Sequence, residues 1–297
     1  MVGTHFLHAA IEAGLDVVAP TRQELDLRDK AVTHAFVTRT APDLIVHCAG
    51  KVGGIAANMA APYEFLVENL EMGANLVNAA VAAQVPKLLN LASSCVYPRD
   101  VEGQLSEDLI LTGQMEPTNE GYALAKVAVL RLCQYASRED PRLSYKSLIP
   151  CNLYGPYDNF DPVSAHLIPA IIRKVHEAKE QNSDQVEIWG DGSARREFMY
   201  VGDLADCMLR ACQRFEDLPE TMNVGLGFDH SVLKYYQAVA SVVDWKGSFT
   251  FDLNRPVGMR RKLVSISRQQ QWGWKSPTSL EEGIRRTYEH FLQEHMQ

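Results

Sequence analysis

Short apolar runs alternate with helical patterns along the first half of the chain, and this alternation constrains the fold more than any other feature. The apolar runs are Asp43–Ala49, Lys87–Ala92 and Leu143–Ile149. Continuous apolar runs of this length are typical of strands that are covered on both faces. The segments with helical spacing are Asp29–Thr40, in which Asp29 is a plausible cap, Pro62–Gln84 and Gly121–Ala136. Strands that alternate with helices predict a parallel, doubly wound sheet.

The start of the chain departs from this pattern. Thr4–Ala13 has helical spacing and ends at Gly14, and Leu15–Ala19 follows as a short predicted strand. A dinucleotide-binding sheet opens with a strand and a glycine-rich turn before its first helix. Met1-Val2-Gly3 precedes the helix as the tail of such a turn would, so we expect the opening strand and two further glycines upstream of Met1. The alternative is that the chain simply starts with a helix.

The second half is less regular and predicts a smaller, mixed α/β part that binds substrate. Predicted strands are Val186–Trp189, Glu197–Val201, Met222–Val224 and Phe249–Phe251. Predicted helices are Ser164–Lys179, Asp203–Phe215, Ser231–Val243 and Ser279–Gln293. The expected fold class is therefore α/β, a Rossmann-like doubly wound parallel sheet whose first strand is missing, followed by this smaller part. We expect a dinucleotide-binding domain over 1–155 and a mainly substrate-binding domain over 156–297, with roughly 195–214 returning to the first. Without a flexible linker, the two parts should share an interface.

Composition excludes several classes of protein. Hydrophobic residues make up 46% of the 297 residues, enough for a sizeable core. The net charge of −8 and the short basic runs argue against a nucleic-acid or anionic-membrane binder. No apolar run is long enough to span a bilayer. The six cysteines lack CxxC or metal-type spacing, so we expect reduced thiols, no metal site and a cytoplasmic protein.

Tyr122 and Lys126 are four residues apart in a predicted helix and therefore lie on one face of it. A free tyrosine titrates near about pH 10, and a neighbouring ammonium favours the phenolate. We therefore expect Lys126 to let Tyr122 exchange a proton near neutral pH, although this spacing alone is also typical of a solvated helix face. Ser93 follows the predicted strand that ends at Ala92, where residues face the ligand crevice. Its hydroxyl can bind the same substrate oxygen that Tyr122 protonates.

Several motifs occur in order along nearly the whole chain. They are Lys51-Val-Gly-Gly-Ile55, Ser93-Ser-Cys-Val-Tyr-Pro98, Glu116-Pro-Thr-Asn-Glu-Gly-Tyr122, Asn152-Leu-Tyr-Gly-Pro156, Asp158-Asn-Phe160, His166-Leu-Ile-Pro169 and Arg196-Glu-Phe198. With these motifs, the chain resembles the extended short-chain dehydrogenase/reductase family. Within it, the chain is similar to the GDP-4-keto-6-deoxy-D-mannose 3,5-epimerase/4-reductases, which form GDP-L-fucose. The resemblance implies an oxidoreductase with isomerase activity in nucleotide-sugar biosynthesis.

The resemblance also implies roles for catalytic residues. The C4 ketone of the sugar acidifies the protons on C3 and C5, and Cys95 and His166 are the candidates that exchange them. Their unperturbed pKa values, about 8.5 and about 6.5, suit proton exchange close to neutral pH. Ser93 and Tyr122 then polarise the C4 carbonyl, Tyr122 delivers the proton, and Lys126 binds the nicotinamide ribose. The alternative for Cys95 is a small buried hydrophobe, and for His166 a hydrogen-bonded loop residue.

Arg22 indicates the cofactor. It follows the predicted strand Leu15–Ala19, where an acidic residue would bind a ribose 2′-hydroxyl and an arginine accommodates a 2′-phosphate. We therefore expect NADPH, with a surface arginine as the alternative. The other expected cofactor contacts are Gly3, Asp26, Leu27, Ala49, Lys51, Leu91, Ala92, Ser93, Ser94, Lys126, Pro150, Cys151, Asn152, Leu153 and His166.

The sugar-nucleotide contacts implied by the resemblance are Lys174, Trp189 and Arg196. Cations suit a diphosphate, whereas Trp189 is as compatible with a core position. Arg260 to Lys262 form a basic cluster that either reaches the phosphates or is solvated. Val257 stands where the family usually has Asp, and Tyr157 where it often has His.

These departures leave other functions open. One alternative is a reductase or epimerase of another nucleotide-4-ketosugar, such as a colitose-type synthase. A second is a non-catalytic NADP-binding protein. The helices Pro62–Gln84 and Gly121–Ala136 have apolar faces that form a homodimer contact in this family, or that pack on the sheet.

Overall fold

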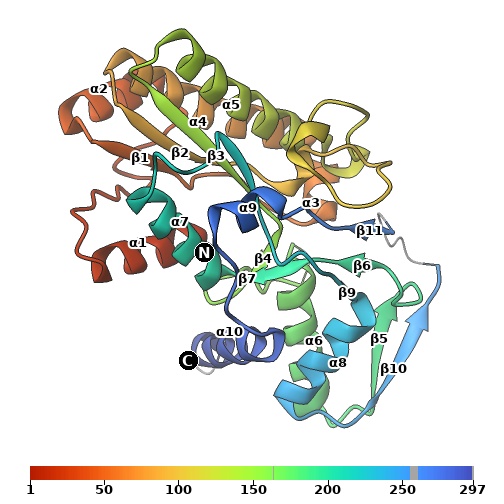
Figure 1. The fold of residues 1–297 in the computed structure, drawn as a ribbon. Helices are drawn as coiled ribbons and strands as arrows, with labels where there is room; N and C mark the ends of the chain where they lie inside the picture. Colours follow the sequence, from red (N-terminus) through yellow and green to blue (C-terminus); the bar gives the residue numbers. More distant parts are fainter. Residues whose placement is uncertain (163, 255–259, 296–297) are drawn as a thin grey trace.

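The computed structural model describes residues 1–162, 164–254 and 260–295 (Figure 1). Its largest sheet has the strand order β1-β2-β3-β8, and every neighbouring pair in it is parallel. The strands are β1 (Leu44–His47), β2 (Lys87–Leu91), β3 (Ser144–Pro150) and β8 (Thr221–Val224). They match the three predicted apolar runs and the predicted strand Met222–Val224, although β3 ends one residue later than predicted and β8 begins one residue earlier.

Helices cover both faces of this sheet, which confirms the predicted doubly wound α/β fold (Figure 1). One face carries α2 (Lys30–Thr40), α4 (Pro62–Ala82) and α5 (Glu120–Glu139). The other face carries α1 (Val2–Glu12) and α7 (Val201–Gln213), which pack against each other. Asp29 caps α2 as expected, because its side chain accepts hydrogen bonds from the Ala31 and Val32 amides. The short helix α3 (Ile55–Ala60) was not predicted.

A buried polar chain crosses three strands of the sheet. Asn90 lies opposite His47 on one neighbouring strand and Ser147 on the other. Its Oδ1 is 3.2 Å from His47 Nδ1, and its Nδ2 donates to Ser147 Oγ at 3.1 Å. These bonds satisfy the Asn90 amide inside an otherwise apolar layer.

The prediction of a strand over Leu15–Ala19 is wrong. These residues have no strand assignment, and no described strand pairs with the outer edge of β1. A strand is defined by ladder hydrogen bonds to a neighbour, and an apolar pattern cannot supply them. Val17 still packs on the core of the sheet, whereas Leu15 and Val18 are exposed.

The described residues of the second part form helices and small sheets. The helices are α6 (Leu167–Glu180), α8 (Val232–Val243) and α10 (Leu280–His295). Strand β5 (Gln185–Trp189) pairs in parallel with β10 (Ser248–Asp252), and β4 (Asn152–Tyr154) with β7 (Phe198–Tyr200). Strand β6 (Arg195–Arg196) lies between β11 (Arg261–Lys262) and β9 (His230–Ser231). Helix α9 (Ser267–Trp272) instead contacts β8 of the main sheet. The short strands β4, β6, β9 and β11 escaped prediction because two or three residues carry no periodic signal.

Helix α6 begins three residues later than predicted, at Leu167. Ser164 is held in a turn, because its amide and its hydroxyl both donate to Asp161 Oδ1. Side chains that bond the local backbone in this way compete with helix formation.

Strand β7 lies between two hydrophobic cores. Met199 belongs to the core of the main sheet, and Phe198 and Tyr200 belong to the core of the second part. Alternation along the strand sends neighbouring side chains to opposite sides, so the two parts are joined through this strand. No described helix is long and apolar enough to cross a membrane.

Candidate active site

The predicted serine, tyrosine and lysine lie together beyond the end of β2. Ser93 caps the 3-10 helix η1 (Ser94–Val96), and its Oγ accepts a hydrogen bond from the Cys95 amide at 3.4 Å. Tyr122 lies in the first turn of α5, and Lys126 lies one turn later. Lys126 Nζ donates to the Leu91 carbonyl at 3.0 Å and lies 5.7 Å from the centre of the Tyr122 ring. The fold therefore brings the three residues to one place from two elements.

A glycine allows this arrangement. A Cβ atom at Gly121 would lie 2.5 Å from the Pro62 carbonyl oxygen, far inside van der Waals contact. The absence of a side chain therefore lets the first turn of α5, with Tyr122, approach the start of α4.

The pKa of Tyr122 moves in the direction opposite to the prediction. Burial raises the pKa of this phenol, and a charge on Cys95 would raise it further, although hydrogen bonding with Ser93 lowers it. Lys126 is turned to the Leu91 carbonyl, and burial lowers the pKa of its own ammonium. Tyr122 is therefore protonated at neutral pH, as a proton donor must be.

Cys95 is buried, and burial raises the pKa of its thiol above the ordinary value. The positive charge of Lys262 opposes this shift most strongly, followed by a hydrogen bond with Ser93. Lys262 is in β11, directly opposite Arg196 in β6. Burial lowers the pKa of Lys262, while Cys95 and Cys151 raise it. Lys262 thus acts electrostatically on the candidate site, a role that the sequence left open.

The other two residues of the basic cluster, Arg260 and Arg261, do not share the environment of Lys262. Arg260 is exposed. Arg261 Nε binds the buried carboxylate of Asp229 at 2.5 Å, and Arg195 Nε binds the other oxygen of the same carboxylate at 2.5 Å. The Asp229 carboxylate therefore ties β6 and β11 together.

His166 precedes the first residue of α6. Its segment is joined to the Lys51–Ile55 motif by a hydrogen bond from the Gly54 amide to the Ser164 carbonyl at 3.3 Å. Burial lowers the pKa of His166, so its imidazole is neutral at pH 7 and available as a base.

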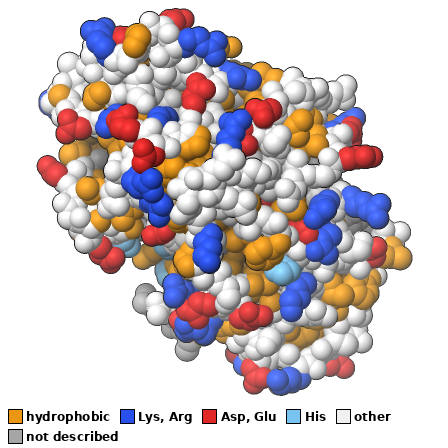
Figure 2. Space-filling view, viewed as in Figure 1, with side chains coloured by type: hydrophobic (Ala, Val, Ile, Leu, Met, Phe, Trp, Pro, Cys, Tyr) orange, Lys and Arg blue, Asp and Glu red, His pale blue; other side chains and the backbone are white. Residues whose placement is uncertain are grey.

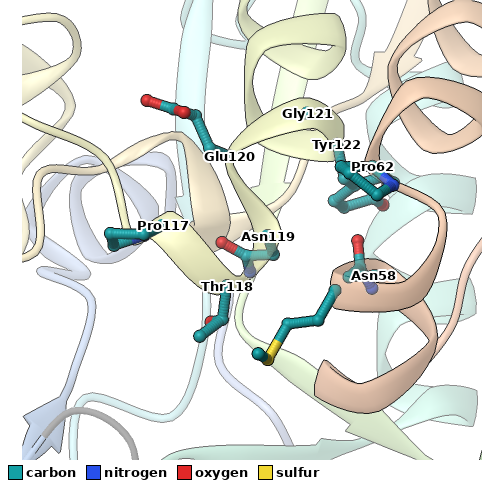
Figure 3. A pocket seen from close by; sticks show the side chains of 9 residues that line it. Asn58, Pro62, Pro117, Thr118, Asn119, Glu120, Gly121 and Tyr122 are labelled. Atoms are coloured by element: carbon teal, nitrogen blue, oxygen red, sulfur yellow. The ribbon is translucent and has the colours of Figure 1, made fainter.

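A cavity of about 230 Å³ adjoins Tyr122 (Figure 3). Its lining residues are Asn58, Met59, Pro62, Pro117, Thr118, Asn119, Glu120, Gly121 and Tyr122. Asn58 Nδ2 donates to the carbonyls of Gly53 and Gly54. The Oδ1 atoms of Asn58 and Asn119 are buried and have no hydrogen-bond partner among the described residues. Sequence reasoning did not single out these two amides, although Asn119 lies within one of the quoted motifs.

The predicted nicotinamide-side residues lie at the carboxyl ends of β1, β2 and β3. A Cβ atom at Gly3 would lie 3.6 Å from Cys48 Cβ, which places the first turn of α1 beside Ala49. Leu91, Ala92 and Ser94 are buried at the end of β2. Pro150, Cys151, Asn152 and Leu153 run from β3 into β4, where Asn152 Nδ2 donates to the Glu197 carbonyl at 2.9 Å.

These strand ends fit a dinucleotide, which binds at this edge of a parallel sheet. A Cβ atom at Gly50 would lie 3.6 Å from Lys126 Nζ, so glycine leaves the backbone close to the ammonium. The Leu91 carbonyl uses one of the three donors of Lys126, and the remaining donors suit ribose hydroxyls.

Two of the predicted cofactor contacts, Lys51 and Arg22, lie beside the carboxylate of Glu68. Lys51 Nζ lies 2.6 Å from Glu68 Oε1 and 2.6 Å from Glu64 Oε2. Arg22 Nη2 is 3.8 Å from Glu68 Oε2, and 72% of the Arg22 side chain is exposed. Asp26 binds Arg28, while the Leu27 carbonyl accepts a bond from Asn75.

The predicted sugar-nucleotide residues occupy the second part. Trp189 is 52% exposed, so the core alternative for this residue is wrong. Lys174 Nζ donates to the carbonyl of Glu187, two residues before Trp189 on β5. Arg196 is partly buried, and the charge of Glu116 raises its pKa while burial lowers it. Figure 2 shows basic and acidic side chains intermixed over one face of the molecule.

The structure describes only one of the two departures from the family pattern. Val257 lies outside the described residues. Tyr157 has a φ of +63°, and the centre of its ring is 4.5 Å from that of His290 in an edge-on contact. This contact joins the Asp158-Asn-Phe160 segment to α10.

Comparison with known proteins agrees with this arrangement. The sequence model of the NAD dependent epimerase/dehydratase family matches residues 1–225. A GDP-L-colitose synthase from Yersinia pseudotuberculosis is 47% identical over 294 residues, which cover 99% of this chain and 96% of that protein. A GDP-L-fucose synthase from Azorhizobium caulinodans is 49% identical over 292 residues, which cover 98% of this chain and 93% of that protein.

A solved structure has the same fold. The GDP-D-glycero-L-gluco-heptose synthase from Campylobacter jejuni, determined in the presence of NADPH, superimposes with a TM-score of 0.88. It is 29% identical, and the match covers 98% of this chain and 95% of that one. The matches confirm the resemblance drawn from the motifs and the NAD(P)-dependent enzyme class that it implied. The chain therefore belongs to the NAD dependent epimerase/dehydratase family.

Proposed function

We propose that this chain is an NADPH-dependent enzyme that epimerises C3 and C5 of GDP-4-keto-6-deoxy-D-mannose and then reduces C4, which yields GDP-L-fucose. One observation carries the proposal. Ser93, Tyr122 and Lys126 converge beyond the end of β2, and the Cys95 thiol belongs to the same cluster. A GDP-L-fucose synthase that is 49% identical over nearly the whole chain supports the choice of substrate.

The cofactor assignment rests on Arg22 and Lys126. When bound, NADPH supplies the hydride that reduces C4. Lys126 and the segment Pro150–Leu153 would hold the nicotinamide ribose end, and the exposed guanidinium of Arg22 would meet the 2′-phosphate. His166 is an additional contact at this end.

Reduction requires a proton for the C4 oxygen. Because burial raises the pKa of Tyr122, its phenol holds a proton at neutral pH and can deliver it as the alkoxide forms. The Ser93 hydroxyl donates a second hydrogen bond to the same oxygen. The positive charge of Lys126 stabilises the phenolate that remains.

Epimerisation requires two groups that exchange protons on opposite faces of the sugar. Cys95 acts as a base only as the thiolate, and Lys262 supplies the charge that favours this form. The neutral imidazole of His166 removes or returns the second proton. Lys174, Trp189 and Arg196 hold the GDP group from the second part of the chain.

The domain assignment and the assembly belong to this proposal. Residues 1–155 bind the cofactor and residues 156–297 mainly bind substrate. We also propose a cytoplasmic homodimer that pairs through α4 and α5, on which Tyr63, Leu124 and Tyr135 are exposed. The buried residues of these helices pack instead on the sheet.

A second substrate is favoured by one comparison. A GDP-L-colitose synthase is 47% identical to this chain. The alternative substrate is therefore a 3-deoxy sugar, which lacks the hydroxyl group on C3. The chemistry at C4 and C5 would use the same residues.

The test is NADPH oxidation by the full chain with GDP-4-keto-6-deoxymannose and, separately, with its 3-deoxy analogue, followed by NMR identification of the product. We expect GDP-L-fucose from the first substrate and a higher kcat/KM for it. A higher kcat/KM for the deoxy analogue would favour the second candidate. Binding of NADPH without turnover of either sugar would indicate the non-catalytic alternative.

A further inference from the structure

Glu197 is a buried carboxylate that joins three separate segments of the chain. It lies between β6 and β7, and its side chain is almost wholly withdrawn from water. Its Oε1 accepts hydrogen bonds from the amides of Leu226 at 2.6 Å and Gly227 at 3.0 Å. Its Oε2 accepts one from the Val264 amide at 3.0 Å. Burial of a carboxylate is costly unless hydrogen bonds compensate, so these bonds hold both segments against β6.

The surroundings leave the Glu197 carboxylate little freedom. A Cβ atom at Gly225 would lie 2.5 Å from Glu197 Oε1 and 2.7 Å from Val264 Cγ2. The main chain of Gly225 is itself fixed, because its amide donates to Gln269 Oε1 at 2.8 Å and its carbonyl accepts from Gln269 Nε2 at 3.0 Å. Glycine at this position therefore lets the loop pack directly on the carboxylate.

The bond to Val264 reaches the strand that carries Lys262. Strand β11 pairs with β6 over only two residues, with Lys262 opposite Arg196. Arg196 directly precedes Glu197, and Val264 follows Lys262 by two residues. On its other side, the segment after β11 forms a bridge with Leu105. Glu197 thus extends a short pairing and fixes β11 on the side of β6.

Lys262 is one of the charged groups around the Cys95 thiol. Cys95 and Val264 belong to the same hydrophobic core. The groups that act on Cys95 are Lys262, Lys126, Ser93 and Tyr122. The groups that act on Lys262 are Cys95, Arg196, Cys151 and Glu116. Of the two ammonium groups, Lys262 favours the Cys95 thiolate more strongly than Lys126 does.

We propose that Glu197 is a positioning residue that holds Lys262 beside the Cys95 thiol. It acts through the Val264 amide and β11. The inference rests on the proposed function, in which Cys95 exchanges a proton of the sugar as the thiolate. The direct effect of the Glu197 charge has the opposite sign, because a nearby carboxylate disfavours a thiolate. Removing the charge alone should make Cys95 more acidic, whereas losing the positioning should make it less acidic.

Deuterium exchange into GDP-4-keto-6-deoxymannose tests this inference as a function of pH. NADP⁺ replaces NADPH, so that reduction does not consume the exchanging sugar. The rate is followed by NMR at the carbon whose exchange Cys95→Ser slows most. The variants of the full chain are Glu197→Gln, Lys262→Met and the double substitution.

A second variant and a matched control accompany these substitutions. Gly225→Ala should displace the Glu197 carboxylate while leaving its charge in place. Asp203→Asn is the control, because Asp203 is also a buried carboxylate and accepts a bond from the Thr278 amide at 3.1 Å. Its bonds join α7 to the segment before α10 and do not involve β11. Circular dichroism and NADP⁺ binding check that each variant is folded.

We expect Glu197→Gln to move the acid limb of the exchange profile to higher pH by about one unit and to slow exchange at pH 7 by about tenfold. Gly225→Ala should move the limb in the same direction. Lys262→Met should move it at least as far, and the double substitution should behave like Lys262→Met alone. Asp203→Asn should leave the limb in place, even if the protein unfolds at a lower temperature.

Several results would overturn the inference. If Glu197→Gln moves the limb to lower pH, Glu197 acts only through its own charge. If the limb stays in place in Glu197→Gln or in Lys262→Met, Glu197 does not act on Cys95 through Lys262. A further shift in the double substitution would show that the two residues act independently. Absence of deuterium exchange in the unsubstituted chain at every pH would instead contradict the proposed function itself.

Discussion

The two ends of the proposed cofactor site are built on different physical principles. At the nicotinamide end, Tyr122, Lys126 and Cys95 are withdrawn from water, and burial is the largest influence on the pKa of each. At the adenosine end, Asp26 and Lys51 keep much of their exposure, and hydrogen bonds to partners of opposite charge are the largest influence.

This contrast follows from the tasks of the two ends. Burial destabilises the charged form, so Tyr122 keeps its proton at neutral pH until the substrate alkoxide forms, as a proton donor requires. Recognition of a phosphate needs permanent charge, which exposed arginine retains. A single charge change should therefore affect catalysis at one end and ligand choice at the other.

Tyr122→Phe should have the largest effect. Loss of the proton donor should reduce C4 reduction by about a thousandfold or more, measured as NADPH oxidation. Solvent deuterium should still enter the sugar at C3 and C5, because Cys95 and His166 remain. If the variant instead lost deuterium uptake but still reduced C4, Tyr122 would act in epimerisation and its assigned role in reduction would be wrong.

Cys95→Ser should slow deuterium exchange by about a hundredfold, because a serine hydroxyl ionises far less readily than a thiol. Reduction of a substrate that has already been epimerised should change less. Cys133→Ser is the control, since Cys133 is a free, buried cysteine on α5, away from the end of β2. Equal loss of exchange in both variants would indicate a general packing defect.

His47→Gln should alter the pH dependence of stability. Burial, together with the charge of Lys126, lowers the pKa of His47 to about 4, whereas the unfolded chain titrates at about 6.5. The folded chain thus keeps His47 neutral, and this contribution is complete above pH 6.5 and is lost as the pH falls towards 4.

Between pH 7 and pH 4.5, the unsubstituted chain should lose about 2 kcal/mol more unfolding free energy than the glutamine variant. Urea unfolding at several pH values measures this difference. The exposed His34 on α2 provides the control His34→Gln, which should follow the unsubstituted chain. If the free energy of unfolding changes equally with pH in all three proteins, burial does not lower the pKa of His47.

Arg28→Leu should have the smallest effect on stability. The pair with Asp26 is exposed, and exposed ion pairs contribute little to folding. The thermal midpoint should be indistinguishable from that of the unsubstituted chain. A large drop in the midpoint of the free protein would show that the pair is structural.

Regular segments and short motifs were predictable because their signals are local. The apolar runs that form β1, β2 and β3 are bounded by helical patterns, and Ser93, Tyr122 and Lys126 stand at fixed places relative to them. Leu15–Ala19 has the composition of a strand but lacks a described strand to pair with, so the prediction from its composition was wrong. Trp189 was ambiguous because an aromatic residue on a short strand suits either face.

By itself, the sequence determined the parallel doubly wound sheet, the family and the residues that converge beyond the end of β2. The sheet follows from the periodicity of short segments, whereas the family and the site residues follow from motifs that occur in order along the chain. Only the tertiary structure decided the charge state of those residues. The raised pKa of Tyr122, the influence of Lys262 on Cys95 and the approach of Glu68 to Arg28 depend on burial and on contacts between distant segments. Solvation and Coulomb interaction act through space, so the order of residues along the chain does not contain them.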